Sequence, residues 1–495
     1  MAAREREMRF TDRMSDHEAL MWSIEKDPWL NPNGASLTIL DRPLDLDHFR
    51  ATMRHAVVKM PRLYERVVPG LARLSPPAWA PDPEFDIDFH VRHVELPAPG
   101  TERELLDLAA QLYQEPLDRT RPLWRFVVID GVEGGRSALW AIMHHAISDG
   151  IGQLRMAELY QQVDPNDPPP PEVDLDAIVA DAVANHSAKE QGGDLASGFG
   201  NTATKTLGHL VRRQLGVARR AAGEVMIWPA DPRRAGDWLG GFADVATSTV
   251  GALMGSGNDV PGGSPLWKQR SRHRHLEWVS VPLDDLKVAA HHFGASINDL
   301  FLTGLTEGAV RYHADRGVEV DAFNTSFVLS TRTDHAIGGN SFTPVPVQVT
   351  GASMSLPERV DDVRVRLAAS REAMSSGGGM SAVSGIANLL PTSVVTQAAR
   401  AAAARIDFAT SNLRGAPFTL YVAGARVRDI VTMGPVAGTG CNATALSYDG
   451  HFDIGLFIDP VAIDAPADFR DAVESSFVDL VGTAGVGAAA VPSRR

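Results

Sequence analysis

Two adjacent histidines followed by an Asp-Gly pair are the residues of this chain best suited to proton chemistry. They form the segment HHAISDG, residues 144–150. A histidine side chain has an unperturbed pKa of about 6.5, so it can accept and return a proton near neutral pH. Both imidazoles could instead be ordinary buried histidines beside a turn. The carboxylate four residues after His145 favours a functional pair, because it can orient a ring or the backbone of the turn.

The flanking residues predict how this segment is presented. Residues 138–143, ALWAIM, form an apolar run typical of a buried strand. Residues 150–163 have the apolar spacing of a helix. We therefore expect His144 and His145 at the end of a strand, where a cleft would open.

The composition excludes several classes of protein. The chain has 495 residues, with 47 Lys and Arg against 61 Asp and Glu, and its net charge of −14 argues against nucleic acid as a main partner. One cysteine, Cys441, allows no internal disulfide and fits a reducing cytosol. The charged N-terminal residues lack the apolar core of a signal peptide. No run approaches the roughly 18 apolar residues of a membrane-spanning helix. We expect a cytoplasmic protein, soluble or bound at a membrane surface.

Strand and helix signals alternate over residues 1–171 and again over residues 266–482. Four prolines at 168–171 interrupt this pattern, since proline continues neither a helix nor a central strand. Residues 172–265 are rich in Ala, Gly and Thr and predict a long, largely helical crossover. Residues 483–495 are expected to be a flexible tail. The pattern predicts an α/β fold in two halves joined by the crossover.

Other familiar motifs lack their structural context. Residues 438–443, GTGCNA, match a dinucleotide-binding pattern, but the residues that follow predict a hairpin with an Asp-Gly turn instead of a helix. The chain has no P-loop lysine, no HExxH and no G-x-S-x-G elbow. A second pair, His291 and His292, is followed by no Asp-Gly and is expected on a helix face. No metal site is predicted.

The segment Ser296-Ile297-Asn298-Asp299 precedes a stretch with helical spacing. Ser296 or Asn298 is well placed to cap that helix. Alternatively, the Asn298 amide points into the cleft and donates a hydrogen bond to a developing oxyanion. The residue types allow both interpretations.

The chain resembles the bacterial wax ester synthase/diacylglycerol acyltransferases from end to end. HHxxxDG is the signature of the CoA-dependent acyltransferase superfamily, which includes chloramphenicol acetyltransferase and peptide-synthetase condensation domains. The other motifs that match the family occur in the family's order: Met14-Ser15-Asp16 with Glu25; Trp79 with Asp82, Phe85-Asp86 and His90-Val91; Leu117-Asp118-Arg119 and Arg121-Pro122-Leu123-Trp124; Ile297-Asn298-Asp299; Ser330-Thr331-Arg332 with Gly339-Asn340; Ser411-Asn412-Leu413-Arg414-Gly415; and Ser447-Tyr448-Asp449-Gly450 with Gly455 and Asp459. Two departures, SNLRG without the family's proline and a less apolar FVLST before Arg332, concern acyl or acceptor preference and leave the reaction unaffected.

The resemblance implies two chloramphenicol-acetyltransferase-like α/β domains with an active-site tunnel between them. His145 is then the general base, and His144 shapes the turn or contacts the pantetheine side. Asp149 pairs with Arg332 and, with Gly150, holds the motif loop, while Asn298 supports the oxyanion. The remaining substrate contacts carried over from the family motifs are Pro122, Leu123, Trp124, Asp299, Ser411 and Asn412. The reaction needs acyl-CoA as co-substrate and no metal or redox cofactor.

The function that the resemblance implies is transfer of a long-chain acyl group from acyl-CoA to diacylglycerol, a fatty alcohol or both, without an acyl-enzyme. Two other classes stay open: a condensation-type enzyme acting on another hydroxyl or amine, and a non-catalytic lipid-binding module. Residues 204–220 combine leucines with five cationic side chains. They predict either a helix lying at a membrane or lipid-droplet surface or an ordinary linker helix. The first option would associate the enzyme peripherally with the inner membrane face or lipid inclusions.

Overall fold

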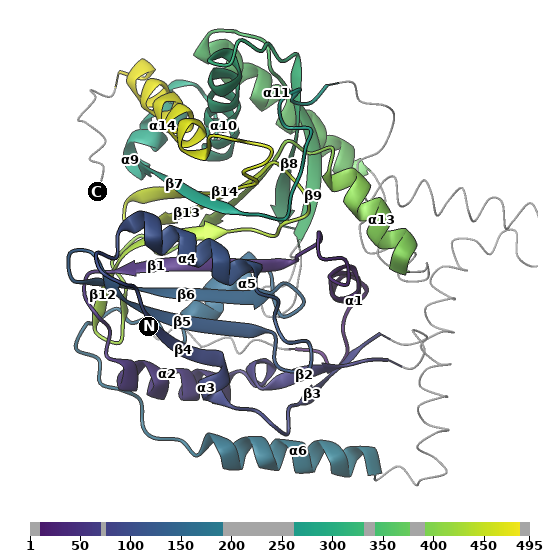
Figure 1. Cartoon of the computed structure of the whole chain (residues 1–495), viewed down its shortest axis with the longest axis vertical. Helices are drawn as coiled ribbons and strands as arrows, with labels where there is room; N and C mark the ends of the chain where they lie inside the picture. The colour runs from purple at the N-terminus through teal and green to yellow at the C-terminus, as the bar shows by residue number, and fades with distance from the viewer. Residues whose placement is uncertain (1–9, 71–75, 192–261, 331–341, 377–391, 486–495) are drawn as a thin grey trace, which may run out of the picture.

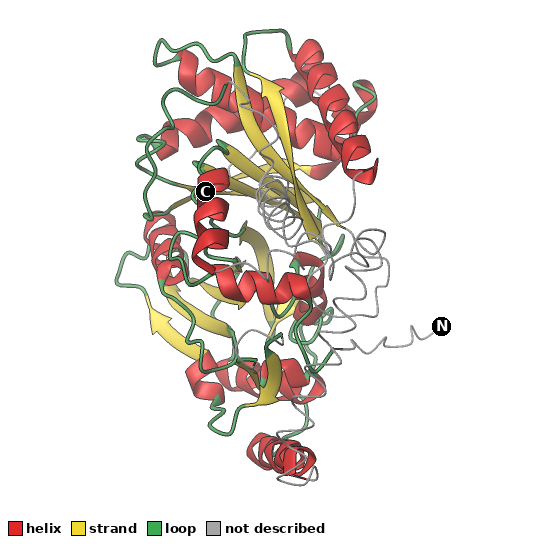
Figure 2. Cartoon of the chain, turned by 90° about the vertical axis from the view of Figure 1, so that its right-hand side faces the viewer, coloured by secondary structure: helices red, strands yellow, loops and turns green. Residues whose placement is uncertain are grey.

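Two six-stranded sheets organise the molecule, and helices pack around and between them (Figures 1 and 2). The computed structural model describes residues 10–70, 76–191, 262–330, 342–376 and 392–485. The strand orders are β11-β12-β1-β6-β5-β4 and β7-β14-β13-β10-β8-β9, and β2 and β3 form a separate ribbon. This is the α/β fold class that the sequence predicts.

The first sheet is built mainly from the N-terminal half. Its strands are β1 (Asn33–Leu40), β4 (Val91–Glu95), β5 (Trp124–Val132), β6 (Arg136–His144), β11 (Tyr421–Val422) and β12 (Ala425–Met433). The ribbon strands are β2 (Glu65–Val68) and β3 (Ala78–Pro81), and the short helix η1 covers Pro61–Leu63. The helices of this half are α1 (Asp16–Ile24), α2 (Leu46–Lys59), α3 (Ile87–His90), α4 (Glu102–Gln114), α5 (Gly150–Ala157) and α6 (Leu175–Gln191).

The second sheet comes entirely from the C-terminal half. Its strands are β7 (His275–Pro282), β8 (Ala322–Ser330), β9 (Phe342–Thr350), β10 (Phe408–Arg414), β13 (Cys441–Tyr448) and β14 (His451–Ile458). The helices of this half are α9 (Leu283–His292), α10 (Ile297–Ala314), α11 (Leu356–Ser376), α13 (Thr392–Ala403) and α14 (Pro466–Thr483). Pro344 and Pro346 lie in β9, at the sheet edge, where a missing backbone N–H costs least.

The two sheets do not correspond to two consecutive halves of the chain, because strands β11 and β12 cross to the first sheet. Although they follow residue 420, they belong to the sheet of the N-terminal half. β12 pairs antiparallel with β1, from Ala35 opposite Met433 to Leu40 opposite Val427. The N-terminal sheet is therefore not formed by residues 1–171 alone. Sequence patterns identify a strand here but not the sheet that it joins.

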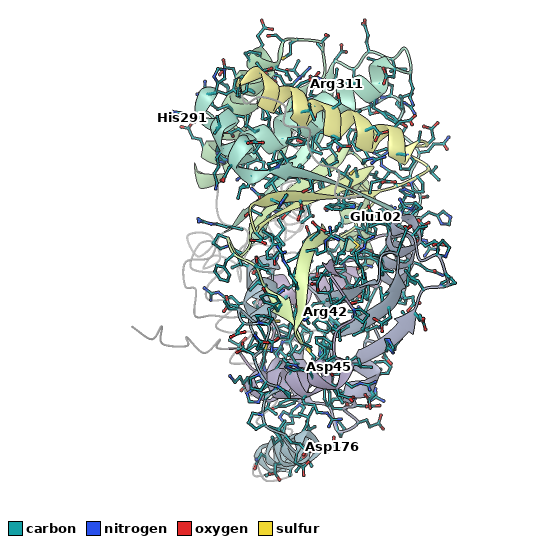
Figure 3. All side chains as sticks on the ribbon, turned by 90° about the vertical axis from the view of Figure 1, so that its left-hand side faces the viewer. Arg42, Asp45, Glu102, Asp176, His291 and Arg311 are labelled. Atoms are coloured by element: carbon teal, nitrogen blue, oxygen red, sulfur yellow. The ribbon has the colours of Figure 1, made fainter. Side chains whose placement is uncertain are left out.

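Two further contacts hold the halves together. Tyr113 on α4 donates its hydroxyl to the carbonyl oxygens of Asn33, at 2.8 Å, and Gly434, at 3.2 Å. It thus ties the start of β1 to the end of β12. Glu102, also on α4, accepts from Trp278 Nε1 of β7 at 2.9 Å, and it lies between the two sheets in Figure 3. Through these hydrogen bonds, α4 contacts both the residue that follows β12 and strand β7 of the second sheet.

Several local predictions can be compared with the structure. Residues 441–458 form the β13–β14 hairpin, whose turn residues Asp449 and Gly450 have φ of 43° and 84°. No helix follows the GTGCNA segment, as expected. His291 lies in the last turn of α9 on the outer surface (Figure 3), and Cys441 is buried. Residues 87–95 combine a helix and a strand. The short helix α3 precedes β4 there, because the Asp86 carboxylate accepts from the Asp88 N–H.

Of the predicted crossover, residues 172–265, the structure describes 172–191, most of which form helix α6, and 262–265. Residues 204–220, which carry the predicted surface helix, lie outside the described residues. Among the helices that the structure describes, none has the length and apolar character needed to cross a membrane.

Candidate active site

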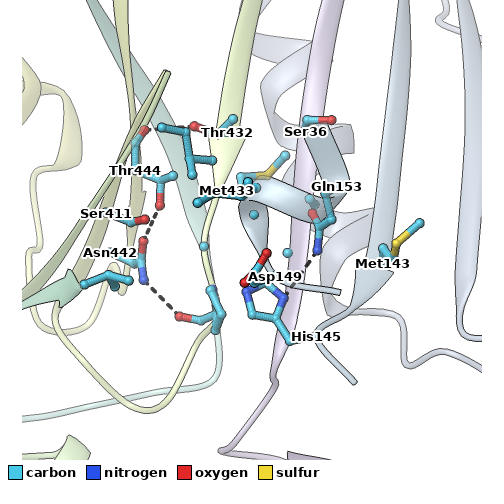
Figure 4. A pocket seen from close by; sticks show the side chains of 18 of the residues that line it. Ser36, Met143, His145, Asp149, Gln153, Ser411, Thr432, Met433, Asn442 and Thr444 are labelled. Carbon is cyan, nitrogen blue, oxygen red and sulfur yellow. Dashed lines mark hydrogen bonds between the residues drawn. The ribbon is translucent and has the colours of Figure 1, made fainter. Parts of the chain in front are cut away.

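A cavity of about 1150 Å³ lies between the two halves and is lined mostly by apolar side chains. The N-terminal half contributes residues of α1, β1, β6 and α5, and the C-terminal half contributes residues of β8, β9, β10, β12, β13 and α13. Figure 4 shows two groups of polar side chains on its walls. His145, Asp149 and Gln153 lie on one side, and Ser411, Asn442 and Thr444 lie on the other.

His145 directly follows β6 and faces this cavity. Its backbone N–H donates to the Pro32 carbonyl at 3.1 Å, and its Nδ1 lies 3.4 Å from Gln153 Nε2. The residue is only 7% exposed. Burial lowers the pKa of His145 to about 3, and the neighbouring Asp149 charge only partly offsets this effect. The imidazole is therefore neutral near pH 7, which is the state in which it accepts a proton.

Gly34 on β1 leaves the space that the His145 ring occupies. The β1–β6 register places Gly34 opposite Met143, next to the end of β6. A Cβ atom at Gly34 would lie 2.8 Å from Cε1 of His145. No side chain fits here without moving the ring. The sequence offers no signal for this contact, because it depends on how two distant strands pair.

His144 has a different environment and does not line the cavity. It is fully buried, and its Nδ1 accepts from the Ala146 N–H at 2.8 Å. A neutral imidazole has one N–H, so the proton lies on Nε2, which is 3.4 Å from Glu25 Oε2. Nδ1 is thus occupied by the backbone of the turn, and Nε2 faces the Glu25 carboxylate. The structure therefore places His144 at the turn and His145 at the cavity, and the part of each in the reaction stays a prediction.

Glu25 and Arg119, two motif residues to which the sequence assigned no role, support the turn that contains His144. Arg119 forms an ion pair with Glu25, and its guanidinium lies 3.4 Å from the centroid of the Trp22 ring. Burial pushes the pKa of Glu25 up, but the interactions with His144 and Arg119 outweigh burial and hold that pKa below its usual value. The Glu25 carboxylate therefore stays charged and holds the His144 ring in position through Nε2.

Asp149 and Gly150 shape the start of α5. Asp149 is the N-cap of this helix and accepts from the Gly152 N–H at 2.9 Å. A Cβ at Gly150 would lie 3.0 Å from Cδ2 of Leu413, so the glycine allows a residue of the opposite half to pack on the motif. Arg332, the predicted partner of Asp149, lies outside the described residues. Their pairing stays a prediction.

Asn298 lies in the first turn of α10, and its predicted oxyanion role stays a prediction. Ser296 caps α10, and Asp299 completes the capping box by accepting from the Ser296 N–H at 2.8 Å. The Asn298 Oδ1 accepts from Asn412 Nδ2 at 2.6 Å, and Asn298 does not line the cavity. Ser411 and Asn412 do line it. The capping role thus belongs to Ser296 and Asp299, and Asn298 reaches the cavity only through Asn412.

Pro122, Leu123 and Trp124 are core residues and do not line the cavity. Trp124 stacks on His90 with ring centroids 4.4 Å apart and donates its indole N–H to the Leu63 carbonyl at 2.7 Å. The Leu123 carbonyl accepts from the His144 N–H at 3.0 Å. These residues thus pack in the core, and the Leu123 carbonyl supports the histidine turn.

His17 on α1 is a cavity residue that the sequence patterns did not single out. Burial lowers its pKa to about 4, so it is also neutral near pH 7. No group of three or more His, Cys, Asp or Glu side chains in the described residues is arranged to hold a metal ion. The cavity therefore presents neutral imidazoles within an apolar space.

Comparison with known proteins identifies the family. Residues 14–301 match the wax ester synthase/diacylglycerol acyltransferase catalytic domain, and residues 338–480 match the C-terminal domain of the same family. Two relatives from Mycobacterium tuberculosis that carry the name diacylglycerol O-acyltransferase are each 28% identical to the chain. One aligns over 488 residues, 96% of this chain and 93% of the relative. The other aligns over 499 residues, 95% of this chain and 97% of the relative.

Solved structures show the same fold. The wax ester synthase/diacylglycerol acyltransferase from Marinobacter aquaeolei VT8 has a TM-score of 0.62 at 16% identity, with 96% of this chain and 100% of that chain covered. The first condensation domain of the calcium-dependent antibiotic synthetase has a TM-score of 0.53 at 16% identity, covering 94% and 95%. The histidine motif, its cavity and the two family matches lead to one conclusion: this chain belongs to the wax ester synthase/diacylglycerol acyltransferase family and is an acyltransferase.

Proposed function

We propose that this enzyme transfers a long-chain fatty acyl group from acyl-CoA to the hydroxyl of diacylglycerol, giving triacylglycerol. A long-chain alcohol, giving a wax ester, is the second acceptor. The observation that carries the proposal is the neutral, buried His145 in the wall of a large, mostly apolar cavity. Acyl chains need such apolar space, and the names of the mycobacterial relatives favour diacylglycerol.

The proposed chemistry requires one base and no acyl-enzyme. His145 takes the proton of the acceptor hydroxyl while the alcohol oxygen bonds to the thioester carbonyl carbon. The tetrahedral intermediate then breaks its C–S bond, and the imidazolium returns the proton to the CoA thiolate. Such general acid–base catalysis contributes on the order of 10²–10⁴ in rate. The neutral state of His145 near pH 7, which leaves one ring nitrogen with a free lone pair, supports its role as the base.

We also propose that the enzyme works at a lipid surface, because the acceptor and the product are insoluble in water. The inner membrane face or a lipid inclusion would supply the acceptor and receive the product. Association with anionic liposomes tests this proposal, and a protein that stays unbound while it uses dispersed diacylglycerol would contradict it.

The experiment that tests the acyl transfer measures acyl-CoA consumption with three acceptors: diacylglycerol, dodecanol and a long-chain amine. The proposal expects His145-dependent turnover with diacylglycerol and weaker turnover with dodecanol. Preference for the amine would favour a condensation-type enzyme. Acyl-CoA binding without consumption would favour a lipid-binding module. Each of these two results would overturn the proposed function.

A further inference from the structure

The cavity wall contains a hydroxyl, that of Ser36, which is available to a ligand. Ser36 lies on β1 and lines the cavity, and Figure 4 shows it above Gln153 and His145. Among the residues that the structure describes, none forms a hydrogen bond with this hydroxyl. Once a lipid has displaced water from the cavity, a hydroxyl without a hydrogen bond is unfavourable. A ligand that brings an acceptor to Ser36 therefore binds more tightly than one that does not.

The strands on either side of β1 leave this hydroxyl free to donate. The register places Ser36 opposite Ala141 on β6, whose side chain is apolar, and opposite Thr432 on β12. The Thr432 hydroxyl donates to the Thr444 carbonyl at 3.0 Å, so its one proton is already used. The Thr444 hydroxyl in turn donates to Asn442 Oδ1 at 2.8 Å. These neighbours bond to one another, and the Ser36 O–H is left for a ligand.

Ser36 lies at a defined distance from the proposed base. Gly34, at which a Cβ would lie 2.8 Å from Cε1 of His145, is two residues before Ser36 on β1. Side chains two residues apart in a strand project from the same face, about 7 Å from each other. Both ring nitrogens are bonded to Cε1, so this spacing holds whichever of them takes the acceptor's proton. A substrate at His145 thus meets the Ser36 hydroxyl about 7 Å from its reacting end.

This distance matches the structure of a 1,2-diacylglycerol. Its free hydroxyl oxygen and the carbonyl oxygen of the adjacent ester are five covalent bonds apart, a reach of about 4–6 Å. Two hydrogen bonds of about 2.8 Å each then allow the hydroxyl to reach the imidazole while the carbonyl reaches Ser36. A simple long-chain alcohol has no oxygen at this position. It would place a methylene group against Ser36 and leave that hydroxyl unpaired.

The cavity wall around Ser36 fits the chain that such an ester carries. Phe126 on β5 lies level with Ser36, because both pair with Ala141 of β6. Ile430 on β12 lies opposite Thr38, the next residue on this face of β1. Phe126 and Ile430 both line the cavity. A hydrocarbon chain suits these side chains better than the amides of the CoA arm, which need hydrogen-bond partners.

We propose that Ser36 is a specificity-determining residue for the acceptor: its hydroxyl donates a hydrogen bond to the ester carbonyl of 1,2-diacylglycerol nearest the reacting hydroxyl. This inference rests on the proposed acyl transfer and names the contact by which the enzyme prefers diacylglycerol to a long-chain alcohol. The bond forms when the acceptor binds and orients the glycerol so that its free hydroxyl faces His145. Ser36 gives up and receives no proton.

The test compares two acceptors that differ only in the ester carbonyls, 1,2-diacylglycerol and ether-linked 1,2-dialkylglycerol. The wild type should use the diacyl lipid about 3- to 10-fold better in kcat/KM, the effect of one neutral hydrogen bond. Ser36→Ala should lose this preference, mainly through a higher KM for diacylglycerol. Ser36→Thr, which keeps the hydroxyl, should retain it. Turnover of dodecanol should not fall in Ser36→Ala, since this alcohol has no carbonyl to lose.

Ser353→Ala is the control substitution. Ser353 is exposed between β9 and α11, so this variant should keep the wild-type preference and melting temperature. Competition with a fluorescent diacylglycerol repeats the comparison as equilibrium binding and needs no turnover. The diacyl lipid should compete better than the dialkyl lipid for the wild type, and equally well for Ser36→Ala.

Two results would overturn the inference. One is a preference for the diacyl lipid that is absent from the wild type or unchanged in Ser36→Ala. The other is a raised KM for acyl-CoA in Ser36→Ala with every acceptor, which would place Ser36 on the CoA arm. A wild type that consumes no acyl-CoA with any acceptor would instead defeat the proposed function, and the binding comparison would still decide whether Ser36 recognises the ester.

Discussion

His144 and Glu25 form a contact that connects the histidine motif to the first helix of the chain. Nε2 of His144 lies 3.4 Å from Oε2 of Glu25, while the Ala146 N–H occupies the other ring nitrogen. His144 therefore supports the turn through both of these contacts. Its neighbour, one residue on, is left to face the cavity.

Glu25→Ala should therefore lower both stability and turnover, because it leaves Arg119 and His144 without their acceptor. Loss of a hydrogen bond to a charged group costs about 1.5–3 kcal/mol, and turnover should fall as the turn loosens. Urea unfolding and acyl-CoA consumption measure the two effects. Asp361→Ala is the control, since Asp361 and its partner Arg364 are both exposed on α11 and such surface pairs contribute about 0–1 kcal/mol. Equal losses of unfolding free energy and turnover in both variants would show that the His144 contact contributes no more than a surface ion pair.

The lowered pKa of Glu25 makes a prediction about acid stability. A carboxyl whose pKa is lower in the folded state contributes stability above its unfolded pKa, near 4.3, and loses that contribution as the pH falls through the folded pKa. Glu25→Gln should thus be less stable than the wild type near pH 7, and the difference should shrink below about pH 4. Unfolding free energies at several pH values test this, and a constant difference would contradict it.

His145→Ala should abolish nearly all acyl transfer and leave the melting temperature little changed at pH 7. The pKa of His145, lowered to about 3 by burial, adds a second effect. Between this value and the unfolded value near 6.5, the unfolded chain binds the extra proton, so wild-type stability falls as the pH decreases through this range. His145→Gln should show a shallower fall. Wild-type turnover in His145→Ala would end the proposal for this base.

Gly34→Ala tests whether the bare backbone of β1 is needed beside the base. The new methyl group would lie 2.8 Å from Cε1 of His145, and displacement of a catalytic group by about 1 Å can cost roughly 10²-fold in rate. Gly482→Ala is the control, because a Cβ there meets nothing within 4 Å. The two variants are compared by kcat and by melting temperature. Unchanged kcat in Gly34→Ala would mean that the ring has room to move.

Asn298 and Asn412 should prove to be coupled. Their 2.6 Å hydrogen bond is exposed, so a double-mutant cycle with alanine should give a coupling of about 0.5–1 kcal/mol in stability. Turnover measured on the same four proteins shows whether the pair also supports the oxyanion. If Asn298→Ser keeps full turnover, the predicted oxyanion role of Asn298 is wrong. Additive stability effects would mean that the hydrogen bond contributes nothing.

Local patterns allowed much of the fold and the centre of the site to be predicted. The apolar run before His144 is strand β6, the segment after Asp149 is helix α5, and the Asp-Gly at residues 449–450 turns a hairpin. Each prediction depends on residues within one element or at its ends. Capping and turn preferences act over a few residues, so they can be seen in a sequence.

Contacts between distant segments could not be predicted in this way. Gly34 meets His145 only because of the β1–β6 register, and Glu25 meets His144 only because α1 packs beside the end of β6. The motif residue Trp124 looked like a substrate contact, but burial and its bond to Leu63 place it in the core. A motif marks residues that matter to the family without showing whether they touch substrate or support those that do.

The placement of β12 has a consequence for how the polypeptide is made. Until residues 425–433 have left the ribosome, β1 lacks the neighbour that covers one of its edges. An uncovered strand edge is a template for pairing with other chains. The N-terminal sheet therefore stays incomplete through most of synthesis. A fragment that ends before β12 should aggregate or require chaperones, whereas the whole protein should not.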